Sequence, residues 1–125
     1  MPPAPALRES EAQFKALADT SPLAIYLSED IEQRYEYINP TAVRLFGYTR
    51  EETPTLAQWW PLAYPEVGYR HAVAQEWQRR IEHAIAMGSA IEPMETVVTC
   101  KDGSLKHILW GYQSIGARNY AFAKT

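Results

Sequence analysis

Three histidines are the side chains of this sequence that most often ligate metals or transfer protons. His71 and His83 fall in a segment with helical periodicity, each about 120° from the centre of its apolar stripe. We therefore expect both on a solvated helix face. His107 alternates with Leu105 and Leu109 in a segment with strand periodicity, which places it on an apolar face. A hydrogen-bonded core or edge position is the simpler interpretation of His107, and a place in a ligand site is the other.

The single cysteine, Cys100, has no partner for an intramolecular disulfide and no Cys-x-x-Cys companion for zinc. It falls in an alternating segment typical of a strand, where it acts as a small apolar residue. A chain that needs no disulfide fits a reducing compartment, so we expect a cytoplasmic location.

Catalytic and nucleotide-binding motifs are missing from the sequence. Residues 79–83, Arg-Arg-Ile-Glu-His, lack the first histidine of a His-x-x-Glu-His metallopeptidase motif. No Gly-x-Gly-x-x-Gly and no Gly-Lys-Ser/Thr phosphate loop occurs. Glu92 and Glu95 project to opposite faces of a strand and do not form an acid–base pair. We expect neither a catalytic site nor a metal site.

Aromatic residues are abundant, with four Trp and eight Tyr in 125 residues. They could simply fill the core, as aromatic side chains do in many proteins. They could also line a pocket for a planar or apolar small molecule, with Trp N–H and Tyr O–H groups as polar anchors. Both interpretations stay open. The candidate ligand-binding residues are Trp60, Tyr64, Tyr69, Trp77, His107, Trp110 and Tyr112.

The N-terminal segments predict a flexible leader followed by a helix. Residues 1–9 hold three prolines and no periodic apolar pattern. Over residues 10–20, a Ser-x-x-Gln capping box and apolar residues at helical spacing predict a helix. Its apolar face, Phe14, Leu17 and Ala18, would be exposed on an isolated domain. We therefore expect a homodimer through these three residues.

Two strands and a short helix are predicted next. Residues 23–27 and 35–38 lie within hairpin reach, with Tyr35 and Tyr37 on one face of the second strand. Asn39-Pro40 predicts the start of a helix, because Asn caps the first turn and Pro suits the first helical position. Gly47 predicts its end.

The middle of the sequence predicts two short helical turns and one long helix. Thr49 and Glu52 form a second capping box, which predicts another helical turn. Residues 56–65 hold two prolines, which allow about one turn of helix. Residues 66–87 carry one apolar stripe and predict a long surface helix.

Three strands complete the predicted order, over residues 94–101, 105–115 and 117–125. Between the first two, Asp102-Gly103 favours a tight hairpin. Strands at both ends of the chain with helices between them indicate an antiparallel sheet with helices on one side, an α+β fold.

Two motifs resemble the PAS family. Residues 37–52, Tyr-Ile-Asn-Pro-Thr-Ala-Val-Arg-Leu-Phe-Gly-Tyr-Thr-Arg-Glu-Glu, are similar to the segment in which the second PAS strand enters a capped helix ending in Gly-Tyr. Residues 99–104, Thr-Cys-Lys-Asp-Gly-Ser, resemble a later PAS hairpin turn. The resemblance implies a PAS domain over residues 21–125, with residues 10–20 as a flanking helix. It implies a five-stranded antiparallel sheet with short helices and one long helix packed on one face.

The resemblance also implies a signalling role. PAS domains sense a small ligand or a partner and relay its state to an output domain of the same polypeptide, such as a histidine kinase of a two-component system or a diguanylate cyclase. This chain would then be a regulatory domain and not an enzyme. The alternative is a dimerisation or protein-interaction module with a filled core and no ligand.

Haem and flavin are not expected, although PAS relatives bind them. Haem-binding relatives use a histidine on the long helix, where His71 and His83 lie on the flank of the apolar stripe. Flavin photoreceptors of the family use a cysteine on a short helix before the long one, and Cys100 lies elsewhere. The resemblance leaves the ligand unknown.

Charge and length exclude other classes. A formal charge of -3 argues against nucleic acid as a partner. No apolar run approaches the roughly 20 residues of a membrane-spanning helix, so no membrane contact is expected. At 125 residues the chain fits one domain.

Overall fold

A five-stranded antiparallel sheet forms the centre of the molecule. The computed structural model describes residues 4–29, 33–116 and 118–125, with their side chains from Ser10 onward. The strands are β1 (Ala24–Glu29), β2 (Arg34–Ile38), β3 (Met94–Thr99), β4 (Leu105–Ile115) and β5 (Arg118–Lys124). The helices are α1 (Ala4–Asp19), α2 (Pro40–Phe46), α3 (Leu56–Ala63) and α4 (Val67–Met87). The strand order is β2-β1-β5-β4-β3, so β1 and β5 pair at the centre, and the predicted α+β class is confirmed.

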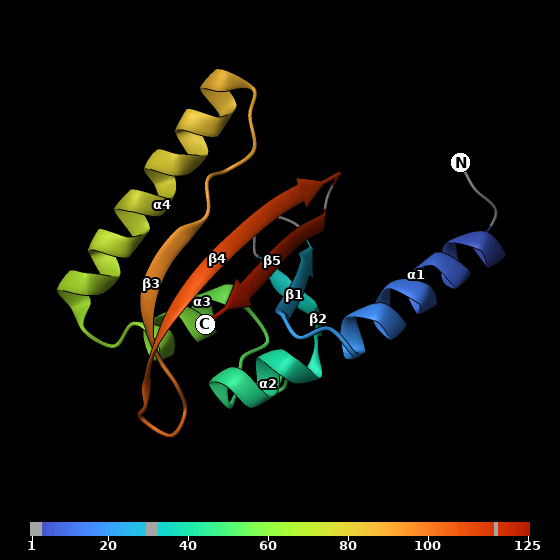
Figure 1. Cartoon of the computed structure of the whole chain (residues 1–125), viewed down its shortest axis with the longest axis horizontal. Coiled ribbons are helices and arrows are strands. Elements are labelled where there is room, and N and C mark those ends of the chain that lie inside the picture. The colour runs from blue at the N-terminus through green and yellow to red at the C-terminus, as the bar shows by residue number, and fades with distance from the viewer. Residues whose placement is uncertain (1–3, 30–32, 117) are drawn as a thin grey trace.

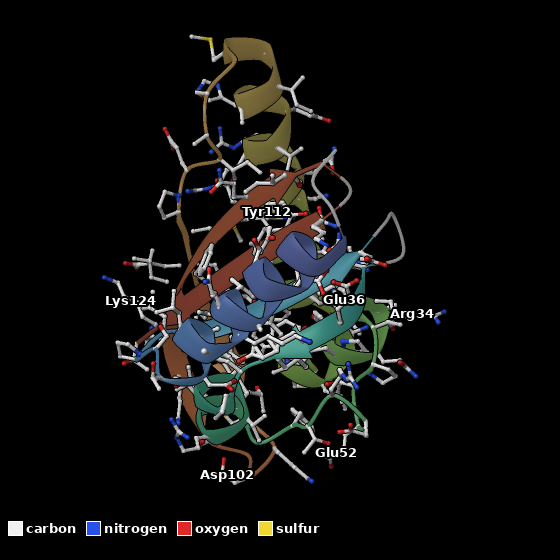
Figure 2. All side chains as sticks on the ribbon, turned by 90° about the vertical axis from the view of Figure 1, so that its right-hand side faces the viewer. Arg34, Glu36, Glu52, Asp102, Tyr112 and Lys124 are labelled. Carbon is white, nitrogen blue, oxygen red and sulfur yellow. The ribbon has the colours of Figure 1, made fainter. Side chains whose placement is uncertain are left out.

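Different helices cover the two faces of the sheet (Figures 1 and 2). α2, α3 and α4 lie over the inner face, where Phe46 and Trp59 pack against buried side chains of the sheet. α1 lies across the outer face, where Phe14 contacts the rings of Tyr37 and Tyr120. The alternation along each strand therefore separates an aromatic core from a smaller interface with α1.

Local signals fix α2 as predicted. The side-chain oxygen of Asn39 accepts a hydrogen bond from the N–H of Ala42 at 3.0 Å, which caps the first turn. Gly47 ends the helix with a φ of 89°. A Cβ on Gly47 would lie 2.9 Å from the Cβ of Lys101, whose N–H donates to the carbonyl of Phe46 at 2.9 Å. The glycine thus lets the end of α2 dock on the turn between β3 and β4.

The N-terminal helix is longer than predicted. α1 begins at Ala4, so the leader expected over residues 1–9 is helical at residues 4–9, and residues 1–3 lie outside the described residues. Pro5 is compatible with this start, because an N–H in the first turn has no acceptor within the helix. The following residues, Ala, Leu, Arg and Glu, are strong helix formers.

A bulge in the first hairpin separates two tyrosines that were predicted to share a face. The register shifts between Leu27 and Ser28, so that Leu27 pairs with Tyr37 whereas Ser28 pairs with Tyr35. The extra residue, Glu36, changes the alternation of β2. Tyr35 therefore points into the core, and Tyr37 points toward α1.

Two helical segments also differ from the prediction. The capping box of Thr49 and Glu52 forms both of its hydrogen bonds, at 2.9 and 3.3 Å, yet the chain makes a turn and no helix. Pro54 follows directly, and the residue before a proline is disfavoured in helical conformation. α3 spans eight residues despite Pro61 in its interior. Pro61 has no N–H, so the carbonyl of Ala57 lacks its helical hydrogen bond. Ala57 is exposed, and water can bind this carbonyl instead.

Candidate functional site

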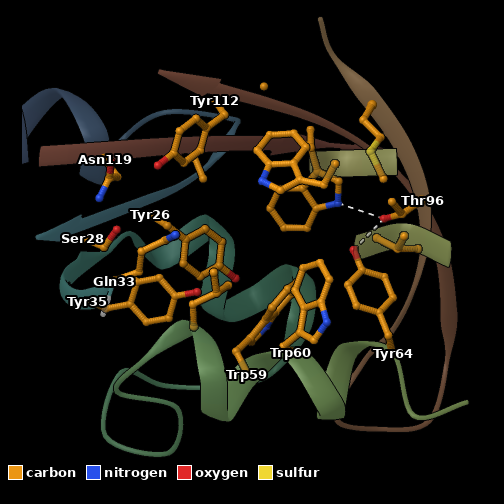
Figure 3. Close-up of a pocket in the computed structure, with 17 residues that line it drawn as sticks. Tyr26, Ser28, Gln33, Tyr35, Trp59, Trp60, Tyr64, Thr96, Tyr112 and Asn119 are labelled. Carbon is orange, nitrogen blue, oxygen red and sulfur yellow. Dashed lines mark hydrogen bonds between the residues drawn. The ribbon is translucent and has the colours of Figure 1, made fainter. Parts of the chain in front are cut away.

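A cavity of about 80 Å³ lies between the inner face of the sheet and helices α3 and α4 (Figure 3). Eight of the 17 residues in its wall are aromatic: Tyr26, Tyr35, Trp59, Trp60, Tyr64, Trp77, Trp110 and Tyr112. The polar side chains in the wall are Ser28, Gln33, Thr96 and Asn119. None of the lining residues that the structure describes carries a charge. All four tryptophans of the chain take part in this wall.

Five of the seven predicted ligand-site residues line this cavity: Trp60, Tyr64, Trp77, Trp110 and Tyr112. Trp77 of α4 meets Tyr112 of β4 edge to face, with ring centroids 5.4 Å apart. Trp60 and Tyr64, one turn apart at the end of α3, also pack edge to face, at 4.8 Å. The aromatic residues that the sequence singles out therefore join helices to sheet around one space.

Tyr69 was assigned to the ligand site, and the structure corrects this. It lies in the first turn of α4 outside the cavity wall, and its hydroxyl accepts a hydrogen bond from the N–H of Val97 at 2.8 Å. β3 is an edge strand of the sheet, so this backbone donor would otherwise face solvent. Tyr69 thus holds α4 against the edge of the sheet.

His107 was also assigned to the ligand site, and it lies on the opposite face of the sheet. Ile108 and Trp110 of β4 point inward, so alternation sends residue 107 outward, where it is exposed. Leu105 shares this outer face and is exposed as well. The alternation of His107 with Leu105 therefore did not indicate that His107 is buried.

The remaining candidate ligands for a metal lie apart from the cavity. His71 and His83 are exposed, which confirms their predicted place on the solvated face of α4. Cys100 is buried just after β3, and its thiol donates to the carbonyl of Leu45 at 3.4 Å. Within the described part of the chain, no group of three or more His, Cys, Asp and Glu side chains is placed to hold a metal ion.

Thr96 of β3 joins two aromatic residues at one end of the cavity (Figure 3). Its hydroxyl is 2.8 Å from that of Tyr64 and accepts from the indole N–H of Trp110 at 2.9 Å. Burial raises the pKa of Tyr64 to about 12, against the hydrogen bond from Thr96, which lowers it. This end of the cavity is therefore a neutral, internally satisfied network near pH 7.

The sequence prediction missed the cavity residues on β1 and β2. Tyr26 and Ser28 line the cavity from β1, and Tyr35 lines it from β2. Burial raises the pKa of Tyr26 and of Tyr35 well above that of a free tyrosine, so both hydroxyls are neutral near pH 7. A serine inside an apolar strand was the available signal, because alternation puts Ser28 on the same face as Tyr26.

The predicted dimer residues differ in their accessibility. Ala18 is buried in its own chain, and Phe14 contacts Tyr37 and Tyr120 with ring centroids 6.0 and 5.7 Å apart. Leu17 is 75% exposed. Most of the predicted face of α1 is thus occupied by the sheet, which leaves Leu17 free to meet a partner.

A family model described as a PAS domain matches residues 12–82, more than half of the chain. The chain belongs to the PAS family. PAS domains are sensory, regulatory modules, and the five-stranded sheet with its helices is the fold of this family. No curated protein matches the sequence. None of the helices in the described residues is both long and apolar enough to cross a membrane.

Solved structures share this PAS fold. A domain of the sensory box sensor histidine kinase/response regulator from Geobacter sulfurreducens is 22% identical, with a TM-score of 0.64 over 95% of this chain and 96% of that chain. A Rhodobacter sphaeroides LOV protein is 15% identical, with a TM-score of 0.68 over 94% and 67%. The photoactive yellow protein domain of the sensor histidine kinase Ppr from Rhodospirillum centenum is 14% identical, with a TM-score of 0.61 over 89% and 92%. At these identities the likeness establishes the fold.

Proposed function

We propose that this PAS domain binds a small ligand in the cavity between the sheet and helices α3 and α4, and relays the bound state to an output domain. The observation that carries the proposal is a cavity whose wall comes from helices and sheet together. A ligand there contacts Trp59 of α3, Trp77 of α4 and Tyr112 of β4. Its binding therefore favours one packing of the helices on the sheet over others.

The output domain that we propose is a histidine kinase, with a diguanylate cyclase as the second candidate. The likeness to a domain of a sensor histidine kinase/response regulator supports the kinase. Catalysis then belongs to the output domain, and this domain regulates it. A cytoplasmic location is part of the proposal, because the lone buried thiol of Cys100 suits a reducing compartment.

Neither haem nor flavin is the ligand that we propose. The wall residues that the structure describes include no histidine and no cysteine that could bond to such a group. They also include no charged side chain, whereas haem propionates and flavin phosphates need partners when they are buried. A smaller, uncharged molecule fits this wall better.

Native mass spectrometry of the purified domain, together with its absorbance spectrum, tests ligand binding. We expect a retained mass beyond that of the protein. Ala121→Leu, which adds an isopropyl group at the cavity wall, should lose this mass. Ala57→Leu, at an exposed position of α3, should keep it. A bare protein mass for all three proteins would contradict a retained ligand.

The second candidate is a dimerisation or protein-interaction module with a filled core. Leu17, 75% exposed on α1, is the observation that favours it. Solution mass measurements test it: the wild-type chain should be a dimer, and Leu17→Glu should shift it toward the monomer. Ile85→Glu, at a position of α4 that is 76% exposed, is the matched control and should leave the dimer intact. A wild-type monomer at high concentration would overturn this candidate.

A further inference from the structure

Three buried residues on the cavity wall carry hydroxyl groups that have no hydrogen-bond partner among the described residues. Tyr26, Ser28 and Tyr35 are 5%, 4% and 8% exposed, and all three line the cavity. Among the residues that the structure describes, none forms a hydrogen bond with these hydroxyls. The large majority of buried polar groups in proteins are paired, so three unpaired hydroxyls around one cavity require an explanation.

These hydroxyls face space and not protein. In the described part of the chain, every side-chain nitrogen or oxygen that is inaccessible to water has a hydrogen-bond partner. The unpaired oxygens of Tyr26, Ser28 and Tyr35 must therefore open onto the cavity. A hydrogen-bonding group that enters the cavity can satisfy them, and an apolar group cannot.

The fold places all three residues on the inner face of the sheet. Tyr26 and Ser28 are two residues apart on β1, and Ser28 pairs across strands with Tyr35. The bulge in β2 is what turns Tyr35 inward beside Tyr26, with ring centroids 5.2 Å apart. Figure 3 shows the Tyr26 and Tyr35 hydroxyls on the same side of their rings, toward Trp59. The Ser28 hydroxyl lies beside Asn119 in the same view, so this half of the cavity carries polar groups at two places in an aromatic wall.

The rest of the wall limits the ligand in charge and size. No described lining residue is charged, so a buried carboxylate, ammonium or phosphate would have no counter-ion there. The cavity of about 80 Å³ is near half the volume, about 150 Å³, of an engineered cavity that binds benzene. A single ring therefore requires more space, which a half-buried wall residue such as Trp60 or Trp77 would have to provide by moving aside.

We infer that the ligand is a small uncharged molecule with an apolar body and one hydroxyl or carbonyl group, which is held by the hydroxyls of Tyr26, Ser28 and Tyr35. This inference rests on the proposed function, because it specifies the ligand of that cavity. The aromatic wall contacts the apolar body edge to face. The three hydroxyls select the polar group, because each can donate or accept a hydrogen bond.

Three monosubstituted benzenes separate the effects of hydrogen bonding and charge on binding: phenol, toluene and benzoate. Phenol is neutral near pH 7, toluene replaces its hydroxyl by a methyl group, and benzoate carries a charge. Binding is followed by NMR through the four Trp indole N–H signals, all of which come from the cavity wall. We expect phenol to bind about tenfold more tightly than toluene, as one or two hydrogen bonds provide, and benzoate not to bind.

Single hydroxyl deletions test the assignment. Tyr26→Phe, Ser28→Ala and Tyr35→Phe should each weaken phenol binding by about two- to tenfold and leave toluene binding unchanged. Tyr120→Phe, on the outer face against α1, is the matched control and should change neither. The cavity variants should melt at the same temperature as the wild type or higher, because an unpaired buried hydroxyl does not stabilise the fold. A purely structural hydroxyl would instead lower the melting temperature when it is deleted.

The outcomes distinguish this inference from the function on which it rests. Equal affinity for phenol and toluene, or unchanged phenol affinity in all three variants, would overturn the hydrogen-bonding class and leave a ligand-binding cavity. Preferential binding of benzoate would overturn the uncharged class. Failure of every probe to perturb the indole signals would overturn both the inference and a ligand-accessible cavity.

Discussion

Asn39 is a fully buried side chain that joins three elements through four hydrogen bonds. Its Oδ1 accepts from the N–H groups of Ile25 and Ala42 at 2.9 and 3.0 Å. Its Nδ2 donates to the carbonyls of Ala18 and Leu23 at 2.9 and 2.8 Å. The end of α1, the start of β1 and the first turn of α2 thus depend on one amide.

Replacing Asn39 should cost much more than removing an ordinary helix cap. Asn39→Ala removes four hydrogen bonds to buried or partly buried backbone groups, of which the N–H of Ala42 and the carbonyl of Ala18 keep a backbone partner. We expect it to lower the free energy of unfolding by about 3 kcal/mol or more. Thr55→Ala, which removes the cap hydrogen bond to Gln58 at the exposed start of α3, should cost about 1 kcal/mol. Urea unfolding followed by circular dichroism measures both. Equal losses for the two variants would contradict the joining role of Asn39.

The sequence predicts one part of what Asn39 does. A cap acts on an amide three residues away, so Asn39-Pro40 identifies the start of α2 from local spacing alone. The carbonyls of Ala18 and Leu23 belong to segments 21 and 16 residues earlier. Such contacts follow from how strands pair, which local propensity does not encode.

At the scale of elements, the described side chains of α1, from Ser10 onward, contact the sheet at a few positions. Phe14 packs edge to face on Tyr37 and Tyr120, and Arg118 of β5 lies 3.2 Å from Glu11. The ion pair is partly exposed and contributes little. Among the described side chains, the docking of α1 therefore depends mainly on the Phe14 ring, the buried Ala18 and the hydrogen bond that the Tyr37 hydroxyl donates to Asp19.

Removing the ring of Phe14 should release α1 without unfolding the sheet. For Phe14→Ala we expect a loss of about 1–2 kcal/mol in docking, because the aromatic pairs and their buried area disappear. Amide exchange in residues 10–19 and tryptic cleavage after Lys15 should both become faster, while the main thermal transition moves little. Gln13→Ala, at an exposed position, is the control and should change neither rate. A large fall in the main transition for Phe14→Ala would show that α1 is part of the core.

Elements set by local chemistry were predicted closely, and those set by their neighbours were not. The capped helix α2 and the hairpin turn at Gly103, with its φ of 86°, follow from single residues. The bulge in β2 has no such signal, because it is a property of two paired strands. The length of α3 also depends on packing, since propensity alone disfavours the interior Pro61.

At the scale of the whole molecule, the cavity also combines residues that the sequence predicts with residues that only strand pairing places there. Aromatic abundance was enough to predict Trp60, Trp77 and Trp110 in the wall. The polar half was missed because the predicted strand ended at residue 27, which left Ser28 outside the alternation that places it on the face of Tyr26. His107 was misplaced for a related reason, since both faces of β4 carry apolar residues.

The whole domain should lose stability in alkali through three buried tyrosines. Burial raises the pKa of Tyr26, Tyr35 and Tyr64 above the ordinary value of 10.0, to about 12 for Tyr64. The folded state keeps these protons after the unfolded state has lost them. Their contribution is therefore complete below about pH 10 and falls as the pH rises through the folded-state values.

Urea midpoints between about pH 9 and 12, measured together with tyrosinate absorbance, test this dependence. Tyr64→Phe should be less stable at neutral pH, because it loses the hydrogen bond to Thr96, yet its stability should fall less steeply above pH 10. A wild-type midpoint that stays constant from pH 10 to 12 would be inconsistent with titration of buried tyrosines.

The pairing of β1 with β5 has a consequence during translation. Ala24 pairs with Ala123, so the centre of the sheet joins residues 99 positions apart in the chain. At about 5–20 residues per second, a ribosome takes roughly 5–20 s to supply the second strand after the first. Until then the nascent chain presents β1 and β2 with an unpaired edge and an uncovered aromatic face. The sheet can form completely only after β5 leaves the exit tunnel. A chaperone that binds the exposed first hairpin would act in that interval.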